Sequence, residues 1–378
     1  MASVQMSMTR GLAAGIAGIA LAASGLTGTG AAGAAAAWPA LAAPAAVRAA
    51  LYGVAATSAE NAWAVGCTWT SSRSPLCAYH GGKTLILRWN GEAWKRQASP
   101  SPGPGSQLSA VAATSASNAW AVGYTGRRKT LILHWNGRVW KRVPSPDPLT
   151  GQDFLYGVAA LSARSAWAVG FGIGNGWQAV VLRWNGRKWK PVPSPTVYVS
   201  ELNGVAVTSA RSAWAVGSDY DGVGSPGTLA EHWNGKAWQQ VAAPDGPKRG
   251  FYSALNGVAA SSAGNVWAVG SSYTGTALVA RWTGSAFTQV ASPAATGLAG
   301  VAATSAANAW AVGGDLILRW NGTAWKQVPS ASPGTGTGFN AVAATSACNA
   351  WAVGSTGSKT LILRWNGKAW KRQRSPGA

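Results

Sequence analysis

The chain has 378 residues and a net charge of +21, from 31 Lys and Arg against 10 Asp and Glu. Hydrophobic residues make up 47% of the sequence, glycine occupies 49 positions, and only 11% of residues are charged. This composition excludes an intrinsically disordered chain and is typical of a β-rich protein with many Gly-containing turns. The excess of positive charge favours attraction to a polyanion.

The N-terminal segment has the pattern of a secretion signal. Arg10 supplies a positive charge, and the apolar stretch 11–23 is too short to span a bilayer. We expect a signal peptide over residues 1–37, with cleavage as late as residue 46, and then a linker over residues 38–50. The mature protein is predicted to be extracellular, with no membrane span, and associated with the cell wall if its partner is a wall polymer.

From Leu51 onward the sequence repeats seven times. Each copy reads approximately LxGVAATSAxNAWAVG…LILRWNGxAWKxVxSP. The first Trp of each copy recurs at intervals of 41 to 57 residues, at Trp63, Trp120, Trp167, Trp214, Trp267, Trp310 and Trp351. These intervals match the length of a propeller blade.

Each copy contains four short β-type runs separated by turn residues. The third and fourth runs are joined by Asn-Gly in six copies and by Thr283-Gly284 in the fifth, and Asn-Gly favours a tight hairpin with positive φ angles. The sequence therefore predicts an all-β, seven-bladed β-propeller with four antiparallel strands per blade, in one domain over residues 51–376. The expected blades are at about 51–100, 108–146, 155–195, 202–244, 255–293, 298–333 and 339–376.

The composition of the runs indicates which strand lies at the axis. The first run is rich in Gly and Ala, which suits the crowded centre, and the long links after Ser-Pro suit the crossing to the next blade. On this arrangement a blade coincides with a sequence repeat. The alternative makes residues 51–56 the outer strand of the last blade.

The chain contains three cysteines. Cys67 and Cys77 fall in the same predicted inter-strand loop, which favours a disulfide in an oxidising compartment. Cys348 occupies a slot that holds other residue types in the other copies, so we expect a free thiol. No zinc-ligand spacing is present.

Two side-chain patterns recur in every copy. Twenty Trp occupy repeat slots, which favours packing between blades over a ligand site. A cation or imidazole precedes the third-strand Trp, and stacking between Trp rings explains this slot without a catalytic role. Its members are Arg88, His134, Arg183, His232, Arg281, Arg319 and Arg364.

Basic residues also mark the fourth strand of five copies, at Lys95, Lys141, Lys190, Lys326 and Lys371, with Arg beside three of them. Lysine on an outer strand protects an unpaired edge from aggregation. A basic rim that docks on an anionic polymer is the second interpretation, and both can hold.

The residues that depart from the repeat concentrate in the second–third loops and the inter-blade links, which share one rim of the disc. Variable loops on a rigid scaffold are where binding usually resides, and aromatic rings with polar neighbours suit stacking on sugars. The alternative is that these aromatics only anchor long loops. The ligand-binding candidates are Trp69, Tyr79, Tyr124, Arg127, Arg128, Phe171, Trp177, Asp219, Tyr220, Asp221 and Tyr273.

Catalytic signatures are weak. The carboxylates are scattered, and the sequence has no nucleophile elbow, metal cluster or nucleotide fingerprint. We therefore expect a non-enzymatic protein without metal or cofactor. A glycosidase or lyase would require Asp219, Asp221 and Asp315 to converge on one pocket.

The repeat WAVG…ILRWNGxxW resembles the tectonin-type propeller repeat, whose members include sugar-binding lectins. Its WNGxxW hairpin is also similar to the Asp-box turn of sialidase-like and photosystem-assembly propellers, with Asn in place of Asp. The region 51–376 is similar to secreted actinobacterial repeat proteins. The resemblance implies a propeller fold and a lectin-like activity.

These observations lead to two binding hypotheses. The first is a monomeric extracellular recognition protein that binds a glycan or an anionic wall polymer through the variable rim. The second is a protein-interaction scaffold in a secreted or surface complex. Export disfavours nucleic acid as the partner.

Overall fold

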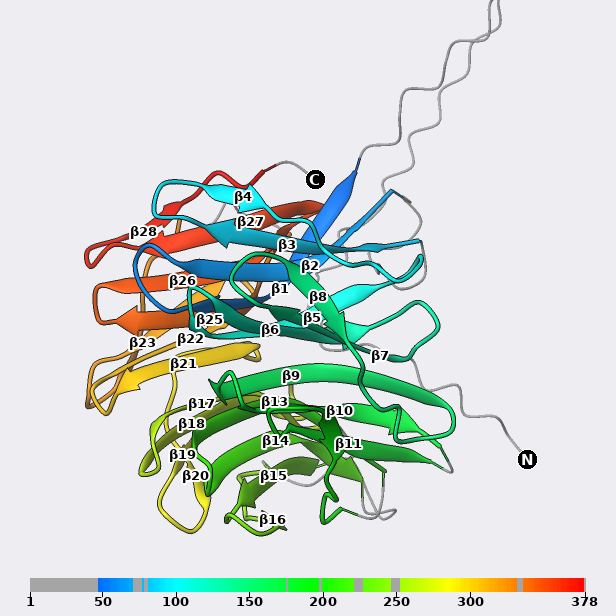
Figure 1. Cartoon of the computed structure of the whole chain (residues 1–378). Helices are drawn as coiled ribbons and strands as arrows, with labels where there is room; N and C mark the ends of the chain where they lie inside the picture. The colour runs from blue at the N-terminus through cyan, green and yellow to red at the C-terminus, as the bar shows by residue number, and fades with distance from the viewer. Residues whose placement is uncertain are drawn as a thin grey trace, which may run out of the picture.

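The computed structural model describes residues 47–70, 77, 81–174, 176–196, 199–220, 227–245, 252–331 and 336–376. These residues form seven four-stranded antiparallel sheets arranged as the blades of a β-propeller (Figure 1). The all-β fold and the number of blades and strands are confirmed. The predicted signal peptide and most of the predicted linker lie outside the described residues.

Each blade consists of four consecutive strands. Their bounds, by blade, are β1 Arg48–Ala56, β2 Ala62–Trp69, β3 Lys83–Trp89, β4 Trp94–Arg96; β5 Gln107–Ser115, β6 Asn118–Tyr124, β7 Thr130–Trp135, β8 Trp140–Val143; β9 Gln152–Ser162, β10 Ser165–Ile173, β11 Trp177–Trp184, β12 Trp189–Pro191; β13 Val199–Ser209, β14 Ser212–Tyr220, β15 Gly227–Trp233, β16 Trp238–Gln240; β17 Ala254–Ser262, β18 Asn265–Ser271, β19 Ala277–Trp282, β20 Phe287–Gln289; β21 Gly300–Ser305, β22 Asn308–Gly313, β23 Leu316–Trp320, β24 Trp325–Gln327; and β25 Thr337–Ser346, β26 Asn349–Thr356, β27 Lys359–Trp365, β28 Trp370–Arg372.

A blade coincides with a sequence repeat, because β1 pairs with β2 rather than with the last blade. The first strand begins at Arg48, three residues before the approximate start expected for the first blade. Ala49 and Ala50 are buried and pair with Thr68 and Cys67, so residues 48–50 belong to the sheet and not to the linker. Extra pairs of this kind also start blades 2 to 5 and 7 before their expected first residues, whereas the first strand of blade 6 begins later, at Gly300.

The first strand of each blade lies at the axis, where the backbones of neighbouring blades approach closely. A Cβ on Gly53 would lie 2.9 Å from the Cα of Ala110 in the next blade, and one on Gly300 would lie 3.1 Å from the Cα of Ala341. Only small residues fit such an approach, which explains the Gly and Ala content of the first run.

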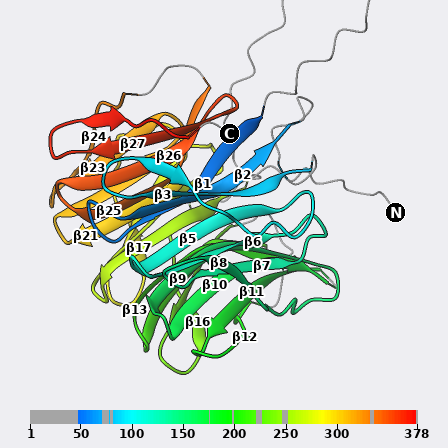
Figure 2. The same ribbon diagram turned by 45° about the horizontal axis from the view of Figure 1, so that its top comes forward.

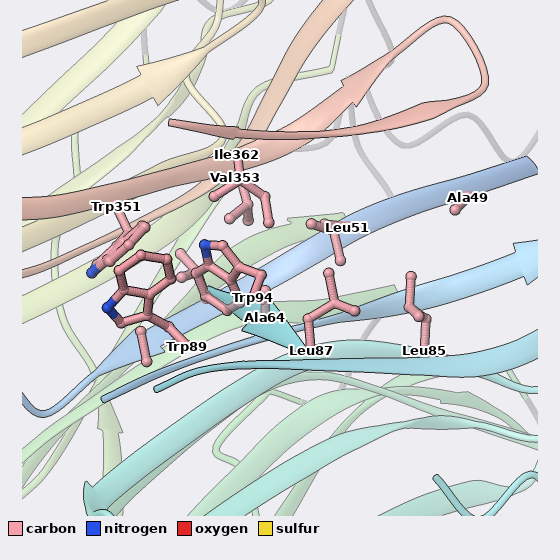
Figure 3. Close-up of a cluster of buried hydrophobic side chains, with 12 residues drawn as sticks. Ala49, Leu51, Ala64, Leu85, Leu87, Trp89, Trp94, Trp351, Val353 and Ile362 are labelled. Carbon is pink, nitrogen blue, oxygen red and sulfur yellow. The ribbon is translucent and has the colours of Figure 1, made fainter. Parts of the chain in front are cut away.

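The ring closes where blade 7 meets blade 1. In Figures 1 and 2 strand β27, near the red end of the chain, lies against blade 1, where it contacts the blue strand β1. Figure 3 shows the core at this boundary, where Trp351 of blade 7 packs on Trp89 and Trp94 of blade 1. Its ring centroid is 5.0 Å from that of Trp89 and 5.1 Å from that of Trp94. Closure thus uses the packing that joins the other blades.

The Trp rows are scaffold, as predicted. The second-strand Trp of each blade is almost fully buried and contacts aromatic rings of a neighbouring blade, as Trp63 does with Trp135 at 5.0 Å and Trp140 at 5.1 Å. The cationic or imidazole side chain that precedes each third-strand Trp also packs among these Trp rings. The Arg88 guanidinium lies 4.9 Å from the Trp63 ring and 5.3 Å from the Trp135 ring, and His134 lies 4.2 Å from Trp120. A buried aromatic ring removes about 150–250 Å² from water, so these rows dominate the core.

The Asn-Gly turns differ in one respect from the predicted tight hairpin. Trp89 and Trp94 are the first paired residues, so the loop has four residues, and only Gly91 has a positive φ, of 100°. The Asn90 side-chain oxygen accepts hydrogen bonds from the backbone N–H groups of Glu92 and Ala93, at 3.2 and 2.9 Å. Asn is therefore used for its side-chain acceptor rather than for a left-handed backbone.

Candidate functional site

The propeller has one uniform face and one variable face. The uniform face carries the first–second and third–fourth turns, tied together by bonds such as Trp89 Nε1 to the Ala59 carbonyl at 3.0 Å. The variable face carries the second–third loops and the inter-blade links, joined by bonds such as Gly105 N to the Gly82 carbonyl at 2.8 Å. The candidate site is built on the variable face.

Five aromatic side chains on blades 2 and 3 form a continuous aromatic cluster: Tyr124, Phe154, Tyr156, Phe171 and Trp177. Phe154 and Phe171 lie at the centre of the cluster. The Phe154 ring centroid is 4.9 Å from that of Tyr124 and 5.0 Å from that of Phe171. Tyr156 and Trp177 lie 5.5 and 5.3 Å from Phe171. Phe154 and Phe171 are buried, whereas Tyr124, Tyr156 and Trp177 are half-buried.

Strand register explains why these rings meet. Phe154 on β9 is directly opposite Phe171 on β10, and cross-strand partners share one face of a sheet. Tyr156 is the extra residue of a bulge in β9, where the register shifts between Leu155 and Gly157. The structure thus brings together three of the predicted residues and adds Phe154 and Tyr156, which sequence reasoning missed. Phe154 stands in a slot that holds Ala, Gln, Glu or Gly in the other copies, which was a readable signal, whereas the slot of Tyr156 holds Tyr, Ser, Asn or Ala and gave a weaker one.

Trp69 has a different environment. It is only 4% exposed and packs with Tyr52 and Ala50 around the disulfide that joins Cys67 and Cys77. A ring buried in this way cannot stack on a ligand without moving the loop. This position favours the loop-anchoring interpretation for Trp69.

Cys348 is an exposed free thiol in the β25–β26 turn.

The remaining predicted residues lie elsewhere on the ring or outside the description. Asp219 and Tyr220 end β14 in blade 4, and the Asp219 Oδ2 accepts a hydrogen bond of 3.1 Å from Gln240 Nε2. Tyr273 is half-buried in the turn after β18 of blade 5. Tyr79 and Asp221 fall outside the described residues.

Arg127 and Arg128 lie in the β6–β7 turn beside the aromatic cluster. Arg128 adopts φ +56°, the one positive φ of a non-glycine residue in the described ranges, and its Nη1 donates to Gln152 Oε1 at 2.7 Å. The same turn in blade 5 places Gly275, φ +77°, at this position. A left-handed non-glycine residue costs about 1 kcal/mol or more, and here the contacts to blade 3 hold it.

This turn forms one wall of a basic hollow at the boundary of blades 1 and 2. The hollow has a volume of about 540 Å³ and contains three cationic side chains, Arg127, Lys129 and Arg142. Its opposite wall is the link through Pro102 and Pro104. None of its lining residues is acidic, so it is suited to an anionic group.

Two buried carboxylates were also missed. Glu231 on β15 occupies a slot that holds Leu or Ala in the other blades, which was a readable signal. It is fully buried, and burial raises its pKa to about 7, while Ser194 Oγ donates to its Oε1 at 2.6 Å. Asp153 on β9 is fully buried near Asp147 and Lys129, and burial raises its pKa to about 6.

In the described part of the chain, the candidate metal ligands and the predicted acidic residues are scattered. No group of three His, Cys, Asp or Glu that could hold a metal occurs among the described residues. Burial lowers the pKa of His134 and His232, so both rings are neutral packing elements at neutral pH. Asp219 in blade 4 and Asp315 in blade 6 lie two blades apart in the ring.

Comparisons with known proteins support the architecture. No family model and no curated protein matches the sequence. Among solved structures, the chain is similar to YCF48 from Cyanidioschyzon merolae (TM-score 0.57, 16% identity, covering 85% of this chain and 96% of that one). It is also similar to YCF48 bound to D1 peptide (TM-score 0.54, 17% identity, covering 84% and 92%) and to the WD40 propeller domain of Doa1 (TM-score 0.55, 12% identity, covering 84% and 95%).

At these identities the likeness shows the fold alone. In the part of the chain that the structure describes, no helix has the length and hydropathy of a membrane span.

Proposed function

We propose that the chain is a non-catalytic recognition scaffold that binds a segment of another protein on its variable face. The observation that carries this proposal is the aromatic cluster, in which a buried Phe154–Phe171 pair supports the half-buried rings of Tyr124, Tyr156 and Trp177. Rigidly supported Tyr and Trp side chains are the residue types that dominate binding energy at protein interfaces.

Two further observations support a protein partner. The basic hollow lies beside the cluster, since its β6–β7 turn follows Tyr124 directly, so one segment can contact both. One structurally similar propeller, YCF48, is described with a bound D1 peptide, which shows that this architecture can present a peptide site. We propose that the protein acts outside the cell, because the disulfide suits an oxidising compartment.

A glycan or an anionic wall polymer is the second candidate for the same face. The half-buried ring of Trp177 favours it, because an indole face at a rim can stack on a sugar ring. Competition distinguishes the two candidates. If the ligand is a saccharide, it should displace peptides that bind to the aromatic cluster.

The test is selection of binding peptides from a random displayed library, followed by titration of the selected peptides. We expect the Tyr124→Ala/Trp177→Ala variant to lose roughly tenfold or more in affinity. Tyr273→Ala, a half-buried tyrosine on blade 5, is the matched control and should bind normally. Selected peptides that bind both variants equally, or saturable binding on a glycan array that displaces them, would refute the protein-segment proposal.

A further inference from the structure

The two exposed residues of each outer strand point to opposite sides of their blade. Lys95 on β4 is paired with Arg88, whose guanidinium lies 5.3 Å from Trp135 of blade 2. Arg96 is paired with Leu87, which packs in the core with Trp351 of blade 7. Cross-strand partners share a face, so Lys95 faces blade 2 and Arg96 faces blade 7.

The same rule applies around the ring and places cations on both sides of three consecutive boundaries between blades. Lys371 is paired with Arg364, which lies over Trp89 of blade 1, so it faces Arg96 across the boundary of blades 7 and 1. Arg142 is paired with Leu133, which packs with Trp63 of blade 1, so it faces Lys95. Lys326 and Arg372 face each other between blades 6 and 7 for the same reason.

This arrangement is confined to one sector of the ring. The corresponding residues of blades 4 and 5 are neutral: Gln239, Gln240, Thr288 and Gln289. Protection of a strand edge against aggregation is needed equally at all seven blades, so it does not explain a one-sided distribution. Like charges that face each other across a boundary between blades repel, and a bound polyanion removes that repulsion.

The boundary of blades 1 and 2 also carries the basic hollow. Arg142 contributes to the basic hollow of about 540 Å³ together with Arg127 and Lys129. Gly126 allows the hairpin to approach the opposite wall, because a Cβ there would lie 1.8 Å from the Pro104 carbonyl oxygen. The hollow therefore gives this row of cations one recessed position for an anionic group.

We propose that the outer wall of blades 6, 7, 1 and 2 binds a flexible acidic polysaccharide, with one anionic group held in the basic hollow. The outer wall of a propeller is convex, and a flexible chain can follow it across the three blade boundaries that carry facing cations. A rigid duplex, with a persistence length of about 50 nm, or a flat bilayer would touch it only along a line. The outer strands of this sector expose Lys, Arg and Gln but no aromatic ring on which bases of a single strand could stack.

The outer wall contains none of the five rings of the aromatic cluster, but it shares the basic hollow with the proposed peptide site, so the two proposals are tested with different variants. The test measures binding of fluorescein-labelled alginate of defined length over a salt series. The rim variant is Lys95→Gln/Arg96→Gln/Arg142→Gln/Lys371→Gln. Gln occurs naturally at both slots, as Gln239 and Gln240 show, so this variant is expected to fold.

The matched control removes four cations from the uniform-face turns: Arg138→Gln/Arg187→Gln/Lys188→Gln/Lys368→Gln. We expect the rim variant to lose roughly tenfold or more in affinity at low salt and to show a shallower salt dependence, with the control close to wild type. Trp177→Ala should leave alginate binding unchanged. Equal losses in both variants, or no loss in the rim variant, would overturn the proposal. Tighter binding of duplex DNA or anionic vesicles than of alginate would also overturn it.

Discussion

The side-chain amide of Asn340 donates a hydrogen bond of 2.8 Å to the carbonyl oxygen of Leu51, joining residues 289 positions apart. Asn256 makes the same bond to Leu298 of its next blade at 2.8 Å, and Asn203 makes it to Leu255 at 3.2 Å. Asn340 is the extra residue of a bulge in β25, the innermost strand of its blade, where the register shifts between Phe339 and Ala341. The closing boundary therefore uses the same chemistry as internal boundaries.

Asn340→Ala should destabilise the protein by about 1–2 kcal/mol, because the Leu51 carbonyl loses its donor in a largely buried position. Urea denaturation followed by Trp fluorescence measures the change. Asn203→Ala is the comparison at an internal boundary and should cost a similar amount. An unchanged midpoint for Asn340→Ala would show that this bond does not contribute to closure.

Trp214→Ala should destabilise the protein strongly, whereas Trp177→Ala should change its stability little. Trp214 is fully buried between blades, so its truncation should cost about 3–5 kcal/mol. Trp177 is half-buried at the variable face, so its truncation should leave the thermal midpoint within a few degrees of wild type. Scanning calorimetry of both variants tests this contrast, which fails if Trp177→Ala is as destabilising as Trp214→Ala.

The buried Glu231 should make stability depend on pH. Its pKa is raised from 4.5 to about 7 in the folded state, so the folded protein keeps a proton that the unfolded chain releases between these values. The free energy of unfolding should therefore fall as the pH rises through this window and level off above about pH 7. Asp153, whose pKa is raised from 3.8 to about 6, acts in the same direction.

Glu231→Leu restores the residue found at this slot in five other blades and should stabilise the protein by about 1–3 kcal/mol at neutral to basic pH. Glu231→Gln keeps a hydrogen-bonding group near Ser194 but cannot ionise, so it should also flatten the pH profile. Urea titrations at several pH values between about 4.5 and 8 measure both effects. A wild-type profile in both variants would assign the pH dependence to other groups.

Cys67→Ser/Cys77→Ser should lower stability by about 2–3 kcal/mol, because the disulfide closes a short loop in the unfolded chain. Trp69 packs beside the disulfide, so hydrogen exchange should rise first at the end of β2. Exchange mass spectrometry with and without reductant resolves this region. Uniform exchange changes across all seven blades would contradict a local role, and Cys348→Ser, which removes the exposed thiol, is the control.

Much of the fold was predictable because each blade is encoded locally. The turn at Asn90-Gly91, the short apolar run of β3 and the placing of the Trp residues all lie within one repeat, so sequence patterns report them directly. The details of Asn90 were less accessible. The same dipeptide serves a two-residue turn or a side-chain-capped loop, and the pairing of Trp89 with Trp94 selects the second.

The site was predictable only in part. Departures from the repeat pointed to the variable face and to Tyr124, Phe171 and Trp177, three rings that the structure brings together. They did not distinguish Trp177, at the rim, from Trp69, which is buried beside the disulfide. Composition cannot separate an anchoring ring from an exposed one, because burial depends on what the loop packs against.

The sequence by itself determined the seven four-stranded blades, the axial position of the Gly- and Ala-rich strands and the structural role of the Trp rows, because repeated local hairpins specify them. Only the tertiary structure decided which exceptions to the repeat become neighbours. Closure of the ring places Lys371 of the last blade opposite Arg96 of the first, and strand register joins Phe154 to Phe171. These relationships depend on contacts between distant residues, which a local pattern does not record.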